Sequence, residues 1–293
     1  MRDLVELFCS IDDFWKTFKS DWDTHLIDNL KSRRGPEPEL TTPEMMTIVV
    51  LFHQSNYRTF KHFYASVQQN LHREFPRLIS YPRFVTLMKK LFVPSFTYLL
   101  HFKGEITGIS FIDSTSINVC HNKRISRNKV FKGLSKLGKT TTGWFYGFKL
   151  HLVINDKGEI LSFQLTPGNV ADVNMLKTPS CGLWGNLFGD KGYISAKIAE
   201  KLFKQGVQVI TGLKSKMKQR LLPIMDKILL RKQSIIETVN DQLKNISQIE
   251  HSRHRSPVNF LINLLSGLVA YTRQPKKPSL KFKNFSEAFS VAV

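Results

Sequence analysis

The order of the apolar segments between residues 105 and 246 is the feature that most restricts the fold of this chain. Residues 106–112 form an apolar run that predicts a strand. Two further runs, at 145–154 and 159–165, flank the turn sequence Asn-Asp-Lys-Gly and predict a hairpin. The following segments predict a short helix at 172–176, a strand at 187–189, a helix at 195–205, a strand at 207–212 and a helix at 231–246. Such an order is typical of a mixed sheet with helices packed on it.

The expected fold class is therefore α/β, a ribonuclease H-like mixed-sheet catalytic domain preceded by an all-helical N-terminal domain. In the helical part, Thr42-Pro43-Glu44 predicts a helix start with a Thr cap, Pro in the first turn and an acid near the positive helix end. The expected domains are the helical domain at 1–104, the catalytic domain at 105–273 with a basic insertion at 121–139, and a basic, flexible tail at 274–293.

Three acidic residues occupy the places where a ribonuclease H-like fold carries acids: the first strand, the fourth strand and a late helix. Asp113 ends the first apolar run, Asp190 ends the run at 186–189, and Glu237 lies in the last predicted helix. Carboxylates on separate elements can converge and hold Mg²⁺ or Mn²⁺, hard cations that prefer oxygen ligands. Two such ions about 4 Å apart serve the attacking and the leaving oxygen of a phosphodiester. The three acids are the candidate catalytic residues and metal ligands.

Each acid also has a structural interpretation. A single Asp at a strand end more often shapes a turn than takes part in catalysis, and a Glu on an amphipathic helix is more often solvated. The competing acids are Asp156, Asp172, Glu159, Asp226, Asp241 and Glu250. Asp156 fits the hairpin turn, and Asp172 fits a helix cap. The combination of position, element order and charge favours Asp113, Asp190 and Glu237.

The helix that carries Glu237 is expected to have two faces. At about 100° per residue, one arc holds Ile235, Ile236, Val239, Leu243 and Ile246, and the opposite arc holds Glu237, Asn240, Asp241 and Lys244. The helix is expected to pack by its apolar arc and to show Glu237 and Lys244 at an open surface.

The charge balance indicates a polyanionic partner. The chain carries 43 Lys plus Arg against 23 Asp plus Glu, a net charge of +20. This excess favours a nucleic-acid partner over a basic soluble enzyme of another kind or a ribosome-associated protein. The insertion at 121–139 contains seven cationic residues and no acid, so it is expected to contact the phosphate backbone of DNA.

Further DNA contacts are expected outside the insertion. Lys149 and His151 alternate with apolar neighbours and so share one side of their strand. His251 and His254 are spaced for a metal, but the neighbouring arginines favour DNA. The candidate DNA contacts are Lys123, Arg124, Arg127, Lys129, Lys132, Lys149, His151, Lys191, Lys244, Arg253, His254 and Arg255. Trp144 and Tyr146 are either core aromatics or platforms for a displaced base.

Cysteine usage and hydropathy indicate a cytoplasmic protein. The three cysteines are far apart and show no zinc-ligand spacing, which fits a reducing compartment. Residues 1–6 lack the apolar core of a secretion signal, and no apolar run approaches the ~20 residues of a membrane span. A cytoplasmic location is therefore expected.

The chain resembles bacterial insertion-sequence transposases of the DDE class, most closely the insertion sequence 982 family. The resemblance is carried by Phe111-Ile112-Asp113-Ser114-Thr115, Gly147-Phe148-Lys149-Leu150-His151, Thr166-Pro167-Gly168-Asn169, Gly189-Asp190-Lys191-Gly192-Tyr193, Ile236-Glu237-Thr238-Val239 and Gln242-Leu243-Lys244. Related transposases carry a Tyr, Arg, Glu and Lys signature. Glu237 and Lys244 keep its second half, whereas Leu230 and Gln233 stand at the Tyr and Arg positions.

The resemblance implies that Asp113, Asp190 and Glu237 bind two Mg²⁺ ions, which Mn²⁺ can replace. It also implies binding to terminal inverted repeats and to target DNA, and assembly into a homodimer or higher multimer. The expected function is nicking at the element ends and joining of the freed 3′-OH to target DNA. The alternatives are a nuclease of the same fold without strand transfer and a non-catalytic DNA-binding protein derived from a transposase.

Overall fold

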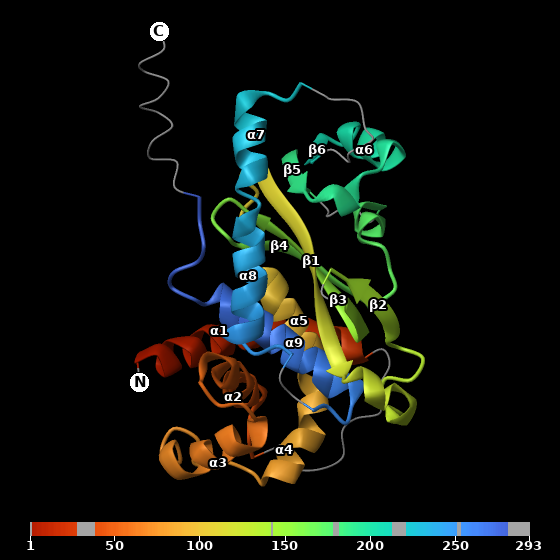
Figure 1. Ribbon diagram of the computed structural model, residues 1–293. Helices are drawn as coiled ribbons and strands as arrows, with labels where there is room; N and C mark the ends of the chain where they lie inside the picture. Colours follow the sequence, from red (N-terminus) through yellow and green to blue (C-terminus); the bar gives the residue numbers. More distant parts are fainter. Residues whose placement is uncertain are drawn as a thin grey trace. The chain divides into compact units, whose positions relative to one another are not determined.

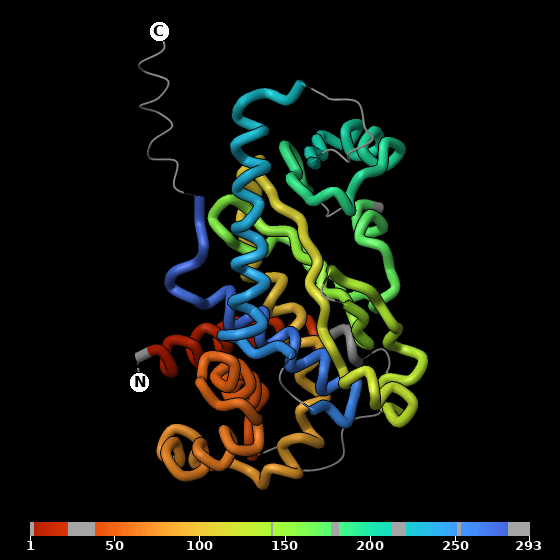
Figure 2. Tube along the Cα trace, viewed as in Figure 1, coloured from red at the N-terminus to blue at the C-terminus, as the bar shows by residue number. Residues whose placement is uncertain are grey.

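The computed structural model describes residues 2–27, 39–141, 143–177, 182–212, 221–250 and 253–280. The chain forms two compact units. The helical unit combines Met1–Phe102 with Gln242–Arg273, and the sheet unit combines Lys103–Asp241 with Gln274–Val293. The first junction lies close to the expected boundary near residue 104. Figures 1 and 2 trace the chain through both units.

The described part of the helical unit is built from helices. They are α1 (Arg2–Ile27), α2 (Thr42–Gln54), α3 (Phe60–Asn70), α4 (Tyr81–Leu87), the 3₁₀ helix η1 (Met88–Leu91), α5 (Phe92–His101) and α9 (Pro257–Thr272). Helix α2 begins where the sequence predicts, but Thr41 is the cap and Thr42 is the first helical residue. The Glu44 backbone N–H donates to Thr41 Oγ1, and the Thr41 N–H donates to Glu44 Oε2 at 2.7 Å. These two bonds satisfy donors that a helix start would otherwise leave free.

Helix α9 belongs to the helical unit, although the sequence suggested that it closes the catalytic domain. It packs against α2 and α5, and most of its side chains are buried. Asn259 Nδ2 on α9 donates to the Val85 carbonyl at 3.3 Å. His53 on α2 contacts the Ser247 carbonyl through Nδ1 at 2.5 Å, which ties the segment before α9 into the same unit. An apolar helix without a polar face needs neighbours on all sides, and the helical unit provides them.

The sheet unit contains a six-stranded mixed sheet. Its strands are β1 (Ile109–Cys120), β2 (Lys136–Thr140), β3 (Gly143–Asn155), β4 (Ile160–Pro167), β5 (Gly185–Gly189) and β6 (Val207–Thr211). Strand β3 pairs antiparallel with β1, β2 and β4, whereas β1, β5 and β6 are parallel neighbours. The predicted α/β class and the β3–β4 hairpin are confirmed, and the strand order is consistent with a ribonuclease H-like domain.

One expectation about this sheet was wrong. Strand β1 does not end before Asp113 but continues to Cys120, because residues beyond Asp113 pair with β3, as in Ser114 with His151. The basic insertion at 121–139 follows directly after β1. It contains the 3₁₀ helix η2 (Asn122–Arg127), and its last residues enter β2, which pairs with β3.

The helices of the sheet unit cover both faces of the sheet. They are η3 (Asp172–Lys177), η4 (Lys191–Tyr193), α6 (Ala196–Phe203), α7 (Ile224–Arg231) and α8 (Ser234–Asn245), the last of which continues into the helical unit. Ile112 on β1 packs in one apolar cluster with Met175 and Leu202, so η3 and α6 cover that face. Successive strand residues face opposite ways, and Asp113 accordingly contacts α8.

The predicted helix at 231–246 is confirmed as α8, which begins three residues later, at Ser234. The preceding helix α7, which ends at Arg231, was not predicted. The apolar arc of α8 is otherwise as expected, with Ile236 and Val239 fully buried. Ile246, which was assigned to that arc, lies beyond the helix end and is exposed.

The segment after α9 returns to the sheet unit. The Leu280 N–H donates to the Asp156 carbonyl at 2.8 Å. The remainder of the expected tail, residues 281–293, lies outside the described residues. Within the described chain, every helix is too short or too polar to cross a bilayer.

Gly147→Ala should strongly destabilise the sheet unit. A Cβ on Gly147 would lie 2.0 Å from the Ile117 carbonyl oxygen of β1, and neither backbone can move without breaking the ladder. We expect a loss of about 1–3 kcal/mol or more in the free energy of unfolding, measured by denaturant titration. Gly212→Ala is the matched control, because its nearest contact would be Lys191 Cε at 3.4 Å. Equal midpoints for the two variants would contradict the prediction.

Candidate active site

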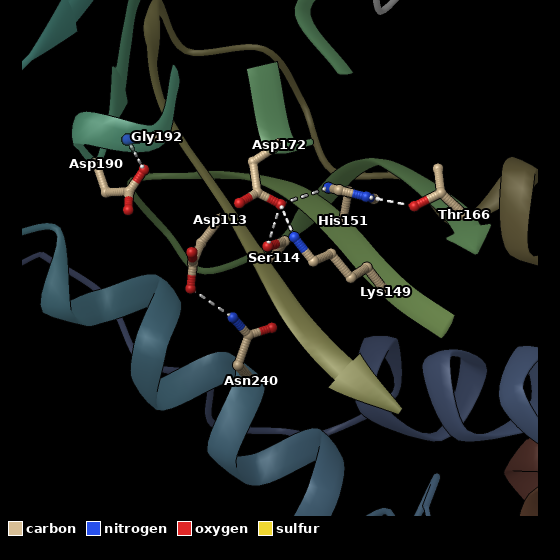
Figure 3. A network of polar contacts seen from close by, with 9 residues as sticks. All are labelled: Asp113, Ser114, Lys149, His151, Thr166, Asp172, Asp190, Gly192 and Asn240. Carbon is tan, nitrogen blue, oxygen red and sulfur yellow. Dashed lines mark hydrogen bonds and ion pairs between the residues drawn. The ribbon is translucent and has the colours of Figure 1, made fainter. Parts of the chain in front are cut away.

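Asp113 lies in the middle of β1 and faces α8 (Figure 3). Asn240 Nδ2 on α8 donates to Asp113 Oδ2 at 2.9 Å. The Asp113 pKa is raised to about 7, first of all by burial of the carboxyl group. The backbone N–H of Ser114 and the Asn240 amide oppose this rise, and the charges of Asp190 and Glu237 add to it. The charges of both other predicted acids therefore act on the Asp113 carboxyl.

Asp190 stands next to Asp113 because of the register between two parallel strands. Ile112 of β1 pairs with Gly189 of β5, so the two aspartates are the next residues along adjacent strands. Asp190 also caps η4, and its Oδ1 accepts the Gly192 N–H at 2.8 Å. Its side chain is exposed. The sequence indicated both roles, a site acid and a turn acid, and the structure shows the turn contact.

Glu237 lies in the first turn of α8 with an exposed side chain. Among the described residues, no three His, Cys, Asp or Glu side chains are grouped closely enough to hold a metal ion as they stand. The donor chemistry nevertheless fits a hard divalent cation, because the electrostatic effect of Asp190 and Glu237 on Asp113 is the repulsion that a cation would relieve.

A second polar cluster centres on Asp172, the first residue of η3 (Figure 3). Asp172 Oδ1 accepts the Ser114 hydroxyl at 2.8 Å and the Lys149 ammonium at 3.0 Å. Both donors are on the strand pair β1–β3, so Asp172 fastens η3 to the sheet. Lys149 is only partly exposed and already engaged. Asp172 therefore ties η3 to β1 and β3 through its side chain, beyond the helix-cap role considered for it.

His151 is fully buried, which differs from the expectation of a DNA-facing side chain. Its Nε2 contacts Thr166 Oγ1 at 2.8 Å, and its Nδ1 is 3.9 Å from Asp172 Oδ1. Burial lowers the pKa of His151 to about 4, with the Asp172 charge acting in the opposite direction. His151 is thus a neutral core residue near neutral pH. The strand alternation correctly placed it on the same side as Lys149 but did not reveal that η3 covers that side.

Tyr193 connects the two clusters electrostatically. It is the last residue of η4, and its side chain is buried in the apolar cluster that includes Ile112. Burial raises the pKa of its hydroxyl, and the charges of Asp113, Asp172 and Asp190 raise it further. Tyr193 therefore stays protonated near neutral pH, and its hydroxyl is influenced by acids from both clusters.

The basic insertion presents its charges to solvent. Figure 2 draws it in yellow-green, leading from the end of β1 into β2. Its cationic side chains are all exposed, namely Lys123, Arg124, Arg127, Lys129, Lys132, Lys136 and Lys139. Trp144 on β3 is 58% exposed, with Lys139 Nζ 5.6 Å from its ring centre, whereas Tyr146 is buried. The two aromatics, which the sequence left open, therefore differ: Trp144 is a surface residue and Tyr146 a core residue.

The other expected DNA contacts divide between the units. Lys191 is exposed in the sheet unit. Lys244 belongs to the helical unit, where its Nζ lies 3.4 Å from Glu250 Oε2.

Arg253 and Arg255 are exposed in the helical unit. Between them, His254 packs edge-on against Phe260, and burial, then the His53 charge, lowers its pKa to about 4. His251 lies outside the described residues.

Asn240 is the residue of this region that the sequence pattern misplaced. It was assigned to the polar arc of α8, but its side chain is only 7% exposed and contacts Asp113. On the helix it lies about 40° from Ile236, at the border of the apolar arc. Asn240 is four residues after Ile236 and three after Glu237, so it lies near both on the helix surface. This spacing was the signal in the sequence that could have placed Asn240 between the apolar core and the acids.

Comparison with known proteins agrees with this geometry. No curated protein is significantly similar to the chain. A sequence model of the family described as "Transposase DDE domain" matches residues 103–257. The match spans just over half of the chain and includes Asp113, Asp190 and Glu237, so the chain belongs to the transposase DDE domain family.

Proposed function

We propose that this chain is an active DNA transposase of the insertion sequence 982 group. It would bind the terminal inverted repeats of its element, nick at the element ends and join each freed 3′-OH to target DNA. The observation that carries the proposal is the β1–β5 register, which sets Asp113 beside Asp190, together with the effect of Asp190 and Glu237 on the Asp113 pKa. Family membership supports the same assignment.

Asp113, Asp190 and Glu237 are the residues that would hold the divalent cations. Two Mg²⁺ or Mn²⁺ ions, when bound, would stabilise charge on the attacking and leaving oxygens of the phosphodiester. Asp113 must give up its proton for this role, and its partly buried position on a central strand holds its carboxyl in a fixed place. Asp172 holds η3 against β1 through Ser114, the residue after Asp113, and so supports that strand from its other face.

DNA contact is assigned mainly to the sheet unit. The exposed cations of the insertion can neutralise backbone phosphates, and this term would dominate affinity and make it depend on salt. Lys191 directly follows Asp190 in the sequence and is exposed. Lys149 on β3 is paired with Asp172, which already neutralises its charge. Lys244, Arg253 and Arg255 would act from the helical unit. A homodimer or larger multimer on DNA and nucleoid association follow from the resemblance alone.

The decisive experiment combines cleavage with strand transfer. Labelled DNA carrying the element ends is incubated with Mg²⁺ and wild type, Glu237→Gln or Glu200→Gln. Glu200 is a matched control, because it is an exposed helical glutamate paired with Lys204 on α6. We expect nicked and joined products from wild type and Glu200→Gln, and neither product from Glu237→Gln, because an amide holds a cation less well than a carboxylate.

Other outcomes would favour the alternative functions. Nicks without joined products would indicate a nuclease of the same fold. Binding to the ends without cleavage, with Mg²⁺ or Mn²⁺, would indicate a non-catalytic DNA-binding protein. Full activity of Glu237→Gln would show that another acid completes the site.

Removing the Asp113 charge should stabilise the metal-free protein at high pH. The folded-state pKa is about 7 against an ordinary value of 3.8, so the folded state holds its proton more tightly than the unfolded state. The free energy of unfolding therefore falls as pH rises from about 4 to about 7. Above pH 7 the Asp113 carboxyl is ionised in both states, and its contribution no longer changes with pH. In EDTA at pH 8, Asp113→Asn should melt several degrees above wild type, and at pH 4 the two should coincide.

Mg²⁺ should raise the melting temperature of wild type at pH 8 and have little effect on Asp113→Asn. Glu200→Gln should behave as wild type throughout. A melting difference between Asp113→Asn and wild type that does not depend on pH would refute the electrostatic explanation.

The insertion should account for a measurable part of the salt dependence of DNA binding. The triple variant Lys123→Ala, Arg124→Ala, Arg127→Ala removes three exposed cations from η2. Each lost phosphate contact should reduce the slope of log K against log salt by about 1, a total of about 3. The control replaces Lys197 and Lys201 of α6 and Lys204, which caps its C-terminal end, with the same change in net charge. Equal slopes for the two triple variants would exclude a direct contact by η2.

A further inference from the structure

Asn240 is the buried polar residue nearest to the candidate catalytic acids. It lies three residues after Glu237 on α8, and its side chain is 7% exposed. Its neighbours on the same face, Ile236 and Val239, are fully buried and apolar. An amide in such surroundings is unfavourable unless its hydrogen-bonding groups are used.

The amide uses only one of its two ends. Nδ2 donates to Asp113 Oδ2 at 2.9 Å, while Oδ1 is buried and has no hydrogen-bond partner among the described residues (Figure 3). A buried acceptor without a partner costs about 1–3 kcal/mol. A side chain chosen for stability alone would be apolar at this position, so the contact with Asp113 is the feature that an asparagine adds.

The chemistry of the contact suits a carboxylate that must bind a cation. A neutral amide N–H holds a carboxylate oxygen in place without adding positive charge that would repel a cation. A Lys or Arg at this position would neutralise Asp113 and compete with the ion. Because α8 also carries Glu237, one helix would set the positions of two of the three acids.

We propose that Asn240 is a positioning residue that holds the Asp113 carboxylate in the orientation required for divalent-cation binding. The inference deepens the proposed function and rests on its cation site. Residues of this kind, which orient a ligand without touching the ion, typically change metal affinity by about 10–100-fold when replaced.

The chain offers a matched contact elsewhere in the same unit. Asn186 Nδ2 on β5 donates to Asp226 Oδ1 on α7 at 3.3 Å, again joining the sheet to a helix through an amide and a carboxylate. Asn186 precedes Asp190 by four residues on its strand and has no part in the candidate site. Asn186→Leu therefore controls for the loss of a sheet–helix amide bond.

The test measures Mn²⁺ binding by electron paramagnetic resonance for wild type, Asn240→Leu, Asn186→Leu and Asp113→Asn. Asn240→Leu should raise the Mn²⁺ dissociation constant by about 10-fold or more, with a denaturation midpoint equal to or above that of wild type. Asn186→Leu should leave the Mn²⁺ dissociation constant within about 2-fold of the wild-type value. A change of that size is well below the effect expected when an orienting residue is replaced. An unchanged constant for Asn240→Leu, or equal losses in both leucine variants, would overturn the proposal.

A second measurement separates this proposal from the proposed function and does not depend on the folding of Asn240→Leu. In metal-free protein, the ¹⁵N–¹H signals of the Asn240 side chain should shift on Asp113→Asn, and those of Asn186 should not. No response at Asn240 would overturn the positioning role. A second outcome is that the Asn240 signals shift but Asp113→Asn binds Mn²⁺ as tightly as wild type does. The contact between Asn240 and Asp113 would then be supported, but the cation site would be refuted, and with it the role of Asn240 in that site.

Discussion

The parallel pairing of β1 with β5 is the interaction on which the candidate site depends. The pair joins residues far apart in the sequence, and its register brings Asp113 and Asp190 to adjacent positions. The stacked rings of Phe111 and Phe188, 5.5 Å apart, pack across the same two strands. A shift of one residue would turn Asp113 toward the apolar cluster under α6 and Ile112 toward α8. The fit of apolar residues on both faces therefore fixes the position of the acids.

This arrangement makes the metal-free protein less stable than its packing would allow. Asp113 is held in a partly buried place near two other acids, and the chain retains it there although its pKa rises to about 7. Asn240 adds a second cost through its unpaired oxygen. Both costs fall on groups that touch or adjoin the site, which is where proteins commonly retain unfavourable contacts for function. His151 carries a similar cost, because its Nε2 contacts Thr166 Oγ1 while its buried Nδ1 has no hydrogen-bond partner among the described residues.

Much of the fold could be predicted from local patterns. Apolar runs and turn residues located β3, β4, β5 and β6, because strand periodicity and turn chemistry are local properties. The length of β1 and the strand β2 could not be predicted, since both depend on pairing with β3. The burial of His151 and Asn240 was missed for a related reason. A helical wheel or a strand alternation shows which way a side chain points, but which element covers it is decided by tertiary packing.

Strand β2 occupies one end of the strand order, so one of its edges is unpaired within the described residues. Exposed edges of this kind can recruit a strand from another molecule and begin aggregation, and charged side chains oppose such pairing. Lys136 and Lys139 are exposed on this strand. The two lysines would therefore oppose aggregation through this edge whether or not DNA is bound. Replacing them with neutral residues is expected to lower solubility in the absence of DNA. The three cations of η2 can be removed without touching this protection, so solubility and DNA affinity can be altered separately within one insertion.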